Sequence, residues 1–171
     1  NSEHFELDCI IFATGFEVGT SYTRRAGYDV VGRDGIVLSE KWAEGLRTLH
    51  GMQTSGFPNS FHMGFTQGAV TVNVPQTLNE QAVHISHVLA TTRDAGADIV
   101  EVTPAAEQEW VDEMIAKARL GARFRAECTP GYYNNEGTAG NGNGFFAANY
   151  GAGPVKFFQI LDDWRSDGTL P

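Results

Sequence analysis

The sequence has little cysteine, few basic residues and no long apolar run. Its two cysteines, Cys9 and Cys128, form no disulfide framework, so a reduced, cytoplasmic protein is the default expectation. Lysine and arginine number 12 against 21 aspartates and glutamates, and the formal net charge of −9 argues against nucleic acid or an anionic membrane as a partner. No segment approaches the ~20 apolar residues of a membrane-spanning helix, and no signal peptide opens the sequence.

What the sequence does contain is typical of one globular domain. The 171 residues are 42% hydrophobic and include 11 phenylalanines and three tryptophans, which is enough bulky apolar material for a sizeable core. The sequence begins at Asn1, without an initiator methionine, and enters an apolar strand within a few residues. Because a central parallel strand needs neighbours on both sides, we expect the C-terminal piece of a larger protein.

The apolar run at residues 9–13 predicts a strand that is buried on both faces. It ends at Thr14-Gly15, where glycine permits a sharp turn and the close approach of another group. In an open α/β sheet, ligands bind beyond the carboxyl ends of the strands, which makes Ala13, Thr14 and Gly15 a candidate ligand edge. The alternative is an ordinary core strand that stops at a glycine.

Local signals predict an α/β chain with a helical C-terminal portion. Further short strands are predicted at residues 29–31, 35–38, 48–52, 61–64 and 99–102. Helices are predicted at residues 40–43 after Ser39, and from Asn73, Thr103 and Pro154 onward. Their apolar faces are expected to contain Leu78, Ala82, Ile85 and Val88 or Leu89, then Trp110, Met114 and Ala118, then Phe157, Ile160 or Leu161, and Trp164. Residues 127–153 are rich in glycine and asparagine, and a loop of this length indicates function or mobility.

The stretch from Phe57 to Pro75 is the most informative for chemistry. A short strand, an irregular loop and a helix capped by Asn73 bring several backbone N–H groups to one point, and Pro75 fits the first turn of that helix. Such an N-terminus favours an electron-rich group: a carboxylate, a phosphate or the carbonyl edge of a reduced flavin. The alternative is a plain connection with a good N-cap.

Two other patterns carry little chemistry. Gly142-Asn-Gly144-Phe-Phe-Ala147 has the form of a dinucleotide fingerprint, but no buried strand precedes it and no amphipathic helix begins at once, so we reject it. His84 and His87 lie three residues apart on a helix, without a cysteine or glutamate at ligand spacing. A solvated or hydrogen-bonded pair is favoured over a metal site there.

Several motifs together resemble the class B flavin monooxygenases, the group that includes the Baeyer–Villiger monooxygenases. The strand that begins at Asp8 and ends in Ala-Thr-Gly-Phe16 is similar to the second fingerprint of that family. Further matching motifs are Trp42 with Gly45, Thr48-x-x-Gly51, Gly56-Phe-Pro-Asn59-x-Phe61, Asn73-Val-Pro75 with Glu80-Gln81, and the segment from Cys128 to Gly137. The resemblance extends from about Asp8 to Trp164. It departs from the family pattern at residues 64–68, where a Gly-Pro-rich turn is common.

This resemblance implies an α/β fold, as the C-terminal fragment of a flavoprotein with two Rossmann-like domains for FAD and NADPH. Residues 1–70 would be a strand-rich part that completes the FAD-binding domain, residues 71–126 would be a helical part that lines the active site, and residues 127–171 would form a mobile lid-like loop and a C-terminal helix. The implied cofactor contacts are Ala13, Thr14, Gly15, Asn73, Val74, Tyr132 and Tyr133, and the implied substrate contacts are Val70, Thr71 and Val72. The catalytic arginine of the family is expected upstream of this chain.

By the same resemblance, the parent enzyme inserts one oxygen atom from O2 next to a ketone carbonyl and yields an ester or a lactone. It would require FAD, NADPH and the missing N-terminal FAD/NADPH-binding region. The isolated chain is expected to be inactive and to hold no cofactor tightly, because it lacks the glycine turn and helix that bind a pyrophosphate. Two alternatives stay open: an N- or S-oxygenating flavin monooxygenase, and a non-catalytic α/β binding module.

Overall fold

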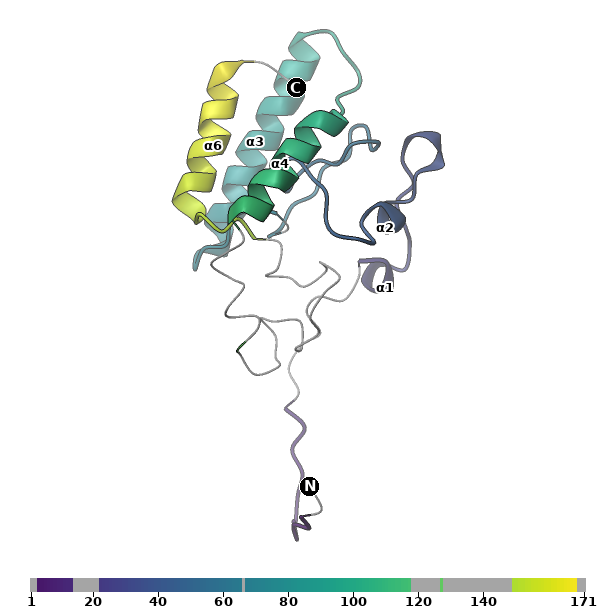
Figure 1. Cartoon of the computed structure of the whole chain (residues 1–171), viewed down its shortest axis with the longest axis vertical. Coiled ribbons are helices and arrows are strands. Elements are labelled where there is room, and N and C mark those ends of the chain that lie inside the picture. The colour runs from purple at the N-terminus through teal and green to yellow at the C-terminus, as the bar shows by residue number, and fades with distance from the viewer. Residues whose placement is uncertain (1–2, 14–21, 66, 118–126, 128–148, 169–171) are drawn as a thin grey trace.

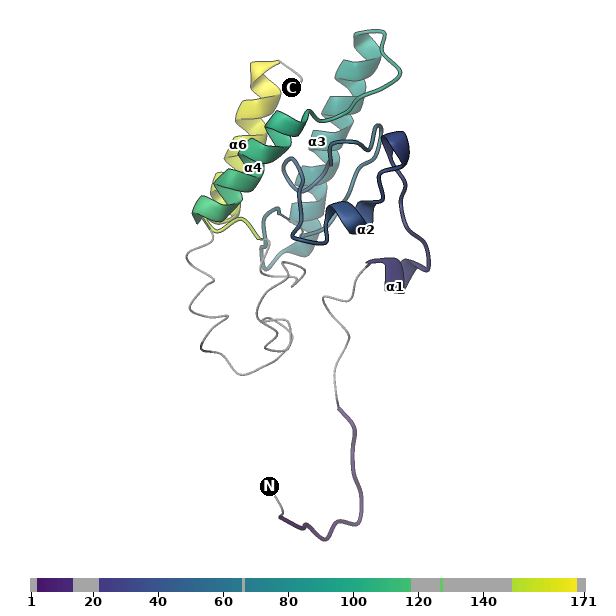
Figure 2. The same ribbon diagram turned by 45° about the vertical axis from the view of Figure 1, so that its right-hand side comes forward.

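The computed structural model describes residues 3–13, 22–65, 67–117, 127 and 149–168. Three long helices form its body: α3 (Val74–Asp94), α4 (Pro104–Lys117) and α6 (Pro154–Asp167). They lie side by side, with the loops that precede α3 packed against them (Figure 1; Figure 2). The shorter elements are α1 (Tyr22–Ala26), the 3-10 helix η1 (Arg33–Gly35) and α2 (Leu38–Lys41).

The starts of α3 and α6 agree with the prediction from the sequence. The side chain of Asn73 caps α3 by accepting a hydrogen bond from the N–H of Gln76 at 3.4 Å, and Pro75 lies in the first turn, where its missing N–H costs no helical bond. Helix α6 begins at Pro154 and is followed by Gly168, whose φ of 72° is the left-handed conformation that glycine adopts without strain. The helical C-terminal portion is therefore confirmed.

The buried face of α3 is largely polar, which corrects the predicted apolar face. Its buried residues are Thr77, Gln81, His84, Val88 and Thr92. Of the predicted face, Val88 is buried, Leu78 and Ile85 are half-buried, and Ala82 and Leu89 are exposed. The prediction ranked positions by hydrophobicity, whereas a side chain such as Gln81 is buried here because hydrogen bonds satisfy its polar atoms.

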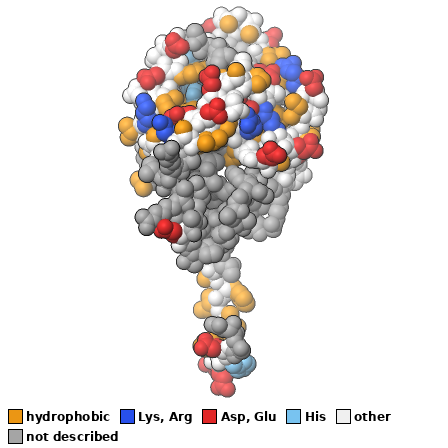
Figure 3. Space-filling model, viewed as in Figure 1, with side chains coloured by type: hydrophobic (Ala, Val, Ile, Leu, Met, Phe, Trp, Pro, Cys, Tyr) orange, Lys and Arg blue, Asp and Glu red, His pale blue; other side chains and the backbone are white. Residues whose placement is uncertain are grey.

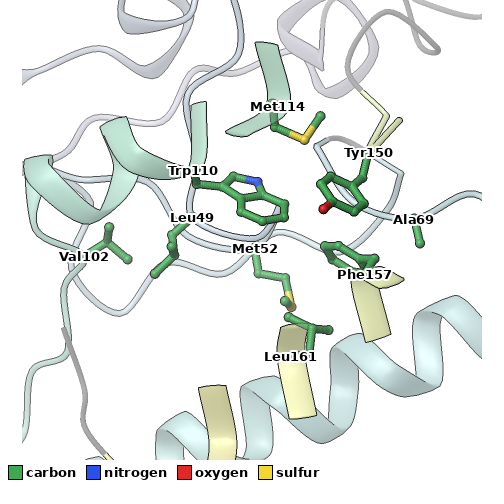
Figure 4. Close-up of a cluster of buried hydrophobic side chains, with 9 residues drawn as sticks. All are labelled: Leu49, Met52, Ala69, Val102, Trp110, Met114, Tyr150, Phe157 and Leu161. Atoms are coloured by element: carbon green, nitrogen blue, oxygen red, sulfur yellow. The ribbon is translucent and has the colours of Figure 1, made fainter. Parts of the chain in front are cut away.

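One hydrophobic core joins α4, α6 and the loops that precede α3. It contains Leu49, Met52, Ala69, Val102, Trp110, Met114, Tyr150, Phe157 and Leu161 (Figure 4). Phe157 and Leu161 lie one turn apart on α6 and are completely buried, as the predicted apolar stripe requires. Burial of each such side chain stabilises the fold by roughly 1.5–3 kcal/mol, so this core holds α6 against α4.

The described residues contain no β-strand, so they do not confirm the α/β expectation. Two isolated bridges occur among them, Val31 with Val37 and Leu49 with Gln53. Between the segments around Asn59 and Val100, a side chain takes part in the hydrogen bonding. The N–H of Asn59 donates to the carbonyl of Val100 at 2.9 Å, and the Asn59 side-chain oxygen accepts from the N–H of Val100 at 3.0 Å. The strands predicted at residues 29–31, 35–38, 48–52, 61–64 and 99–102 are wrong, because short apolar runs occur in loops as well. Residues 29–31 and 35–38 are joined only by the bridge between Val31 and Val37.

The predicted strand at residues 9–13 is exposed and unpaired among the described residues. Ile11 and Phe12 expose 85% and 83% of their surface. Figure 1 shows the segment running away from the helical body. A strand is buried on both faces only when neighbouring strands flank it, and the described part of the chain supplies none.

The short helix α2 begins at Leu38 rather than at residue 40. Ser39 lies inside it, and its hydroxyl donates to the carboxylate of Asp29 instead of capping the helix. Over the face seen in Figure 3, acidic and basic side chains are interspersed. Among the described residues, no helix combines the length and the apolar character needed to cross a membrane.

Candidate functional site

The predicted flavin contacts Asn73 and Val74 lie at the N-terminus of α3. Asn73 is exposed, and Val74 exposes 41% of its surface. The hydroxyl of Thr71 accepts from the N–H of Asn73 at 3.1 Å and donates to the Asn73 carbonyl at 2.6 Å, which holds the entry into the helix. No described residue accepts a hydrogen bond from the N–H of Val74, so this donor at the positive end of the helix dipole can serve a ligand.

The predicted substrate wall, Val70, Thr71 and Val72, leads directly into this helix. Val70 and Thr71 are half-buried, and Val72 is completely exposed. The hydroxyl of Thr71 also lies 3.2 Å from that of Thr77, one turn into α3. The predicted wall and the predicted flavin contacts therefore form one continuous stretch, in which Val72 and Val74 are exposed at the start of a helix.

A buried glutamine of α3 holds the loop that precedes the wall. The side chain of Gln81 is completely buried, accepts from the N–H of Gly64 at 3.0 Å and donates to the Gly64 carbonyl at 2.6 Å. Both ends of the amide are satisfied, and a buried polar group in this state fixes the geometry around it. The sequence analysis included Gln81 in a family motif but had no signal for its partner.

Gln67 fixes the same loop to the preceding segment. Its side-chain oxygen accepts from the N–H and the hydroxyl of Thr48 at 2.9 and 2.6 Å, and its amide nitrogen donates to the carbonyl of Leu46 at 2.6 Å. The φ of Gln67 is 46°, in the left-handed region that few residues other than glycine adopt. Contacts around a residue must enforce such a conformation. Gly64 and Gln67, within the segment at which the sequence departs from the family pattern, are thus held by hydrogen bonds.

Two glutamates hold the turn that contains Ser55 and Gly56. Glu107 accepts from the N–H of Ser55 at 2.8 Å, and Glu101 accepts from the N–H of Gly56 at 2.9 Å. The Nζ of Lys41 lies 3.1 Å from the Glu107 carboxylate and donates to the Ser55 carbonyl at 2.7 Å. The buried carboxylate therefore has a cation and an N–H donor, which offset the cost of removing its charge from water.

Sequence reasoning missed both glutamates. Glu107 lies in the first turn of α4, where a carboxylate complements the helix dipole, but no local pattern identifies Ser55 as its partner 52 residues away. Glu101 also accepts from the guanidinium of Arg33 at 2.6 Å. This bond lowers the pKa of the Glu101 carboxyl, which keeps it ionised at neutral pH.

A buried histidine pair lies between two tryptophans. The rings of His50 and His84 have centroids 5.5 Å apart, with Trp110 4.9 Å from His50 and Trp164 4.8 Å from His84. Burial, with a smaller contribution from His84, lowers the pKa of His50 to about 3. Burial, with smaller contributions from Arg165 and His87, lowers the pKa of His84 to about 4. Both rings are therefore neutral at pH 7.

The solvated or hydrogen-bonded pair expected at His84 and His87 is corrected by this arrangement at His84. His84 is buried in contact with His50, and its Nδ1 has no hydrogen-bond partner among the described residues. A histidine can be buried in this way because the neutral ring costs far less to desolvate than the charged one. In the described part of the chain, no group of three or more His, Cys, Asp or Glu side chains could hold a metal ion.

The remaining predicted contacts are not assembled into a site by the described residues. Ala13 is exposed at the end of residues 3–13. The positions outside the described ranges are Thr14, Gly15, Tyr132 and Tyr133, together with Ala118, Cys128 and the Gly142 to Ala147 string. Their assigned roles stay predictions.

Comparison with curated proteins identifies relatives over nearly the whole chain, although no family model matches. The chain is 46% identical over 172 residues to pentalenolactone D synthase from Streptomyces exfoliatus, which covers 99% of this chain and 29% of that protein. It is 43% identical over 164 residues to the Baeyer-Villiger monooxygenase of Streptomyces coelicolor, which covers 95% and 26%. The chain thus spans less than a third of the length of these relatives.

A solved structure has a similar fold over most of the chain. The polycyclic ketone monooxygenase from the thermophilic fungus Thermothelomyces thermophila aligns with a TM-score of 0.76 at 35% identity, covering 88% of this chain and 24% of that one. The relatives and this structure confirm the resemblance that the motifs predicted.

Proposed function

We propose that this chain is the C-terminal part of an FAD- and NADPH-dependent Baeyer–Villiger monooxygenase. The observation that carries the proposal is 43% identity, across 95% of the chain, to a protein named as such a monooxygenase. The similarity in fold to a polycyclic ketone monooxygenase supports the same assignment. The enzyme would insert one oxygen atom from O2 next to a ketone carbonyl and yield an ester or a lactone.

The start of α3 fits the edge of a flavin. The N–H of Val74, for which no described residue is an acceptor, and the positive end of the helix dipole both complement an electron-rich carbonyl. The exposed side chains of Val72 and Val74 offer apolar surface beside that donor. A related monooxygenase has been solved as a complex with FAD and NADP. Bound FAD supplies the oxygen chemistry, and NADPH supplies the electrons.

In this proposal the chain binds and orients rather than reacts. Val70, Thr71 and Val72 form a wall that places the ketone and excludes water. Ala13, Thr14 and Gly15 lie at the junction of the two nucleotide-binding domains, and Tyr132 and Tyr133 stack over NADP. The catalytic arginine belongs to the part of the parent enzyme outside this chain, which also completes the FAD and NADPH sites around residues 1–70.

Two other functions predict different products. An N- or S-oxygenating flavin monooxygenase would share the flavin chemistry but would oxidise an amine or a sulfide. A non-catalytic α/β binding module would hold no flavin. The similarity to a polycyclic ketone monooxygenase favours oxidation of a ketone over both of these alternatives.

The test is turnover by the full-length protein that contains this chain. Cyclic and polycyclic ketones, a sulfide and an amine are each added with NADPH and isotopically labelled O2, and products are identified by mass spectrometry. We expect ketone-dependent NADPH oxidation and one labelled oxygen atom in the resulting ester or lactone. Oxidation of the sulfide or the amine without any ketone product would favour the N- or S-oxygenating alternative, and a protein without flavin would favour the binding module.

A further inference from the structure

Two aromatic residues bind consecutive carbonyls at the base of the predicted substrate wall. The indole Nε1 of Trp110 donates to the carbonyl of Gln67 at 3.2 Å. The backbone N–H of Tyr150 donates to the carbonyl of Gly68 at 2.9 Å. The two rings stack with centroids 5.4 Å apart and planes inclined by 23°, and Figure 4 shows them side by side. We call this pair, Trp110 with Tyr150, the aromatic clamp.

Helix α4 anchors both halves of the clamp. Trp110 belongs to α4, and the hydroxyl of Tyr150 donates to Glu113 on the same helix at 2.8 Å. Burial, followed by the hydrogen bond to Glu113, raises the pKa of Tyr150 to about 12, so its hydroxyl stays a neutral donor at physiological pH. Both aromatic side chains are buried. The clamp therefore forms a rigid part of the core.

The wall has few other supports. Ala69 is completely buried and Val72 is completely exposed, so the chain passes from the core to the surface over a very short distance. No described residue forms a hydrogen bond with the backbone of Val70 or Val72. The position of the wall therefore depends on the start of α3 at one end and on Gln67 and Gly68 at the other. The clamp holds the carbonyls of Gln67 and Gly68, and the Gln67 side chain adds its bonds to Thr48 and Leu46.

We propose that the aromatic clamp positions the substrate wall Val70–Val72 and thereby sets which ketones the enzyme accepts. The proposal rests on the function proposed above. A shift of the carbonyls of Gln67 and Gly68 moves Val70 with them, because each planar peptide leaves only two soft dihedrals per residue. Trp110 and Tyr150 are positioning residues, since neither has to touch the substrate.

The variants for the test act on the anchor of the clamp rather than on its ring packing. Tyr150→Phe and Glu113→Ala each remove the hydrogen bond between these two side chains. Glu113→Gln keeps an acceptor for the Tyr150 hydroxyl and should behave like the wild type. Tyr28→Phe is the matched control, because it removes a hydroxyl from a tyrosine that is 65% exposed.

Steady-state kinetics of the full-length protein give the first measurement. We expect the KM for a bulky cyclic ketone to rise about tenfold in Tyr150→Phe and Glu113→Ala, as for a lost hydrogen bond to a charged acceptor. NADPH oxidation without ketone should stay at the wild-type rate in both variants. A purely structural role would instead lower the melting temperature and reduce the rates of NADPH oxidation with and without ketone together. That result would overturn the proposal.

Hydrogen–deuterium exchange gives a second measurement that does not depend on activity. We expect the amides of residues 67–73 to exchange about tenfold faster in Tyr150→Phe and Glu113→Ala, and at the wild-type rate in Glu113→Gln and Tyr28→Phe. If the wild type oxidises no ketone, the proposed function is wrong, and exchange in this loop still decides whether the clamp holds it. Unchanged exchange in Tyr150→Phe and Glu113→Ala would overturn the positioning role.

Discussion

The carboxylate of Glu107 accepts a hydrogen bond from the backbone N–H of Ser55 at 2.8 Å, across 52 residues of sequence. The next N–H along the chain, that of Gly56, donates to Glu101 at 2.9 Å. Two carboxylates, Glu101 just before α4 and Glu107 in its first turn, thus hold two consecutive amides of one turn. Because Lys41 also pairs with Glu107 at 3.1 Å, this junction ties the loops before α3 to the helical body.

Glu107→Ala should destabilise the fold strongly. The change leaves the N–H of Ser55 and the ammonium of Lys41 without the carboxylate, and removal of one partner from a buried ion pair costs about 3–5 kcal/mol. The Lys41 side chain is 17% exposed, so we expect the free energy of unfolding to fall by about 3 kcal/mol, at the low end of that range. Urea denaturation measures the change, and the exposed Glu109→Ala on the same helix should stay within about 0.5 kcal/mol of wild type. Equal stabilities of the two variants would contradict the prediction.

Asn73→Ala should weaken the start of α3. It removes the side-chain oxygen that accepts from the N–H of Gln76, and loss of such a cap costs about 1 kcal/mol of stability. In the full-length enzyme we also expect weaker flavin retention, measured as the absorbance that stays with the protein after desalting. Asn79→Ala, an exposed change within the same helix, is the control and should retain the flavin fully. Full retention by Asn73→Ala would speak against flavin contact at this helix start.

Acid should destabilise the protein through its buried histidines. The pKa values of His50 and His84 are about 3 and about 4 in the folded protein, below the ordinary 6.5, so the unfolded state binds more protons between these values. The stability from the neutral rings is present above pH 6.5 and is lost as the pH falls toward 3. We expect the free energy of unfolding to fall by up to about 1.4 kcal/mol per pH unit for each histidine.

The measurement is urea unfolding at a series of pH values between neutral and acid. His50→Phe keeps an aromatic ring in the same place and removes one titrating group, so its stability should fall less steeply with pH than that of the wild type. The slopes of unfolding free energy against pH can be compared even if the substitution lowers stability by the same amount at every pH. Parallel curves for the two proteins would show that His50 is not responsible.

The isolated chain of residues 1–171 should bind no flavin and consume no NADPH with any ketone. Tight FAD binding in this kind of fold requires a strand and a glycine turn that lead into a helix N-terminus, and the part of the chain that the structure describes offers no such strand, turn and helix. Contact with one edge of the ring does not offset the freedom lost on binding. The test is a visible spectrum after mixing with excess FAD and desalting. A near-stoichiometric flavin band would reveal a binding site elsewhere in the chain.

The exposed residues 9–13 show how far apolar patterning reaches. The run has the composition of a strand buried on both faces, but Ile11 is 85% exposed in the structure. An apolar composition indicates that a segment is suited to burial, but the segment is buried only when neighbouring strands cover it. The face of α3 shows the opposite case. Gln81 and His84 occupy buried positions that hydrophobicity alone would assign to apolar residues.

The sequence by itself determined where α3 and α6 begin and which family motifs the chain carries. Caps, prolines and periodic stripes act over one or two helical turns, so Asn73 and Pro154 could be identified from their neighbours alone. Only the tertiary structure decided which polar groups hold the loop before the predicted substrate wall. Gln81 reaches Gly64 across 17 residues, and Trp110 reaches Gln67 across 43. Contacts at such separations leave no local pattern, because they depend on hydrogen bonds that form only once distant segments are packed together.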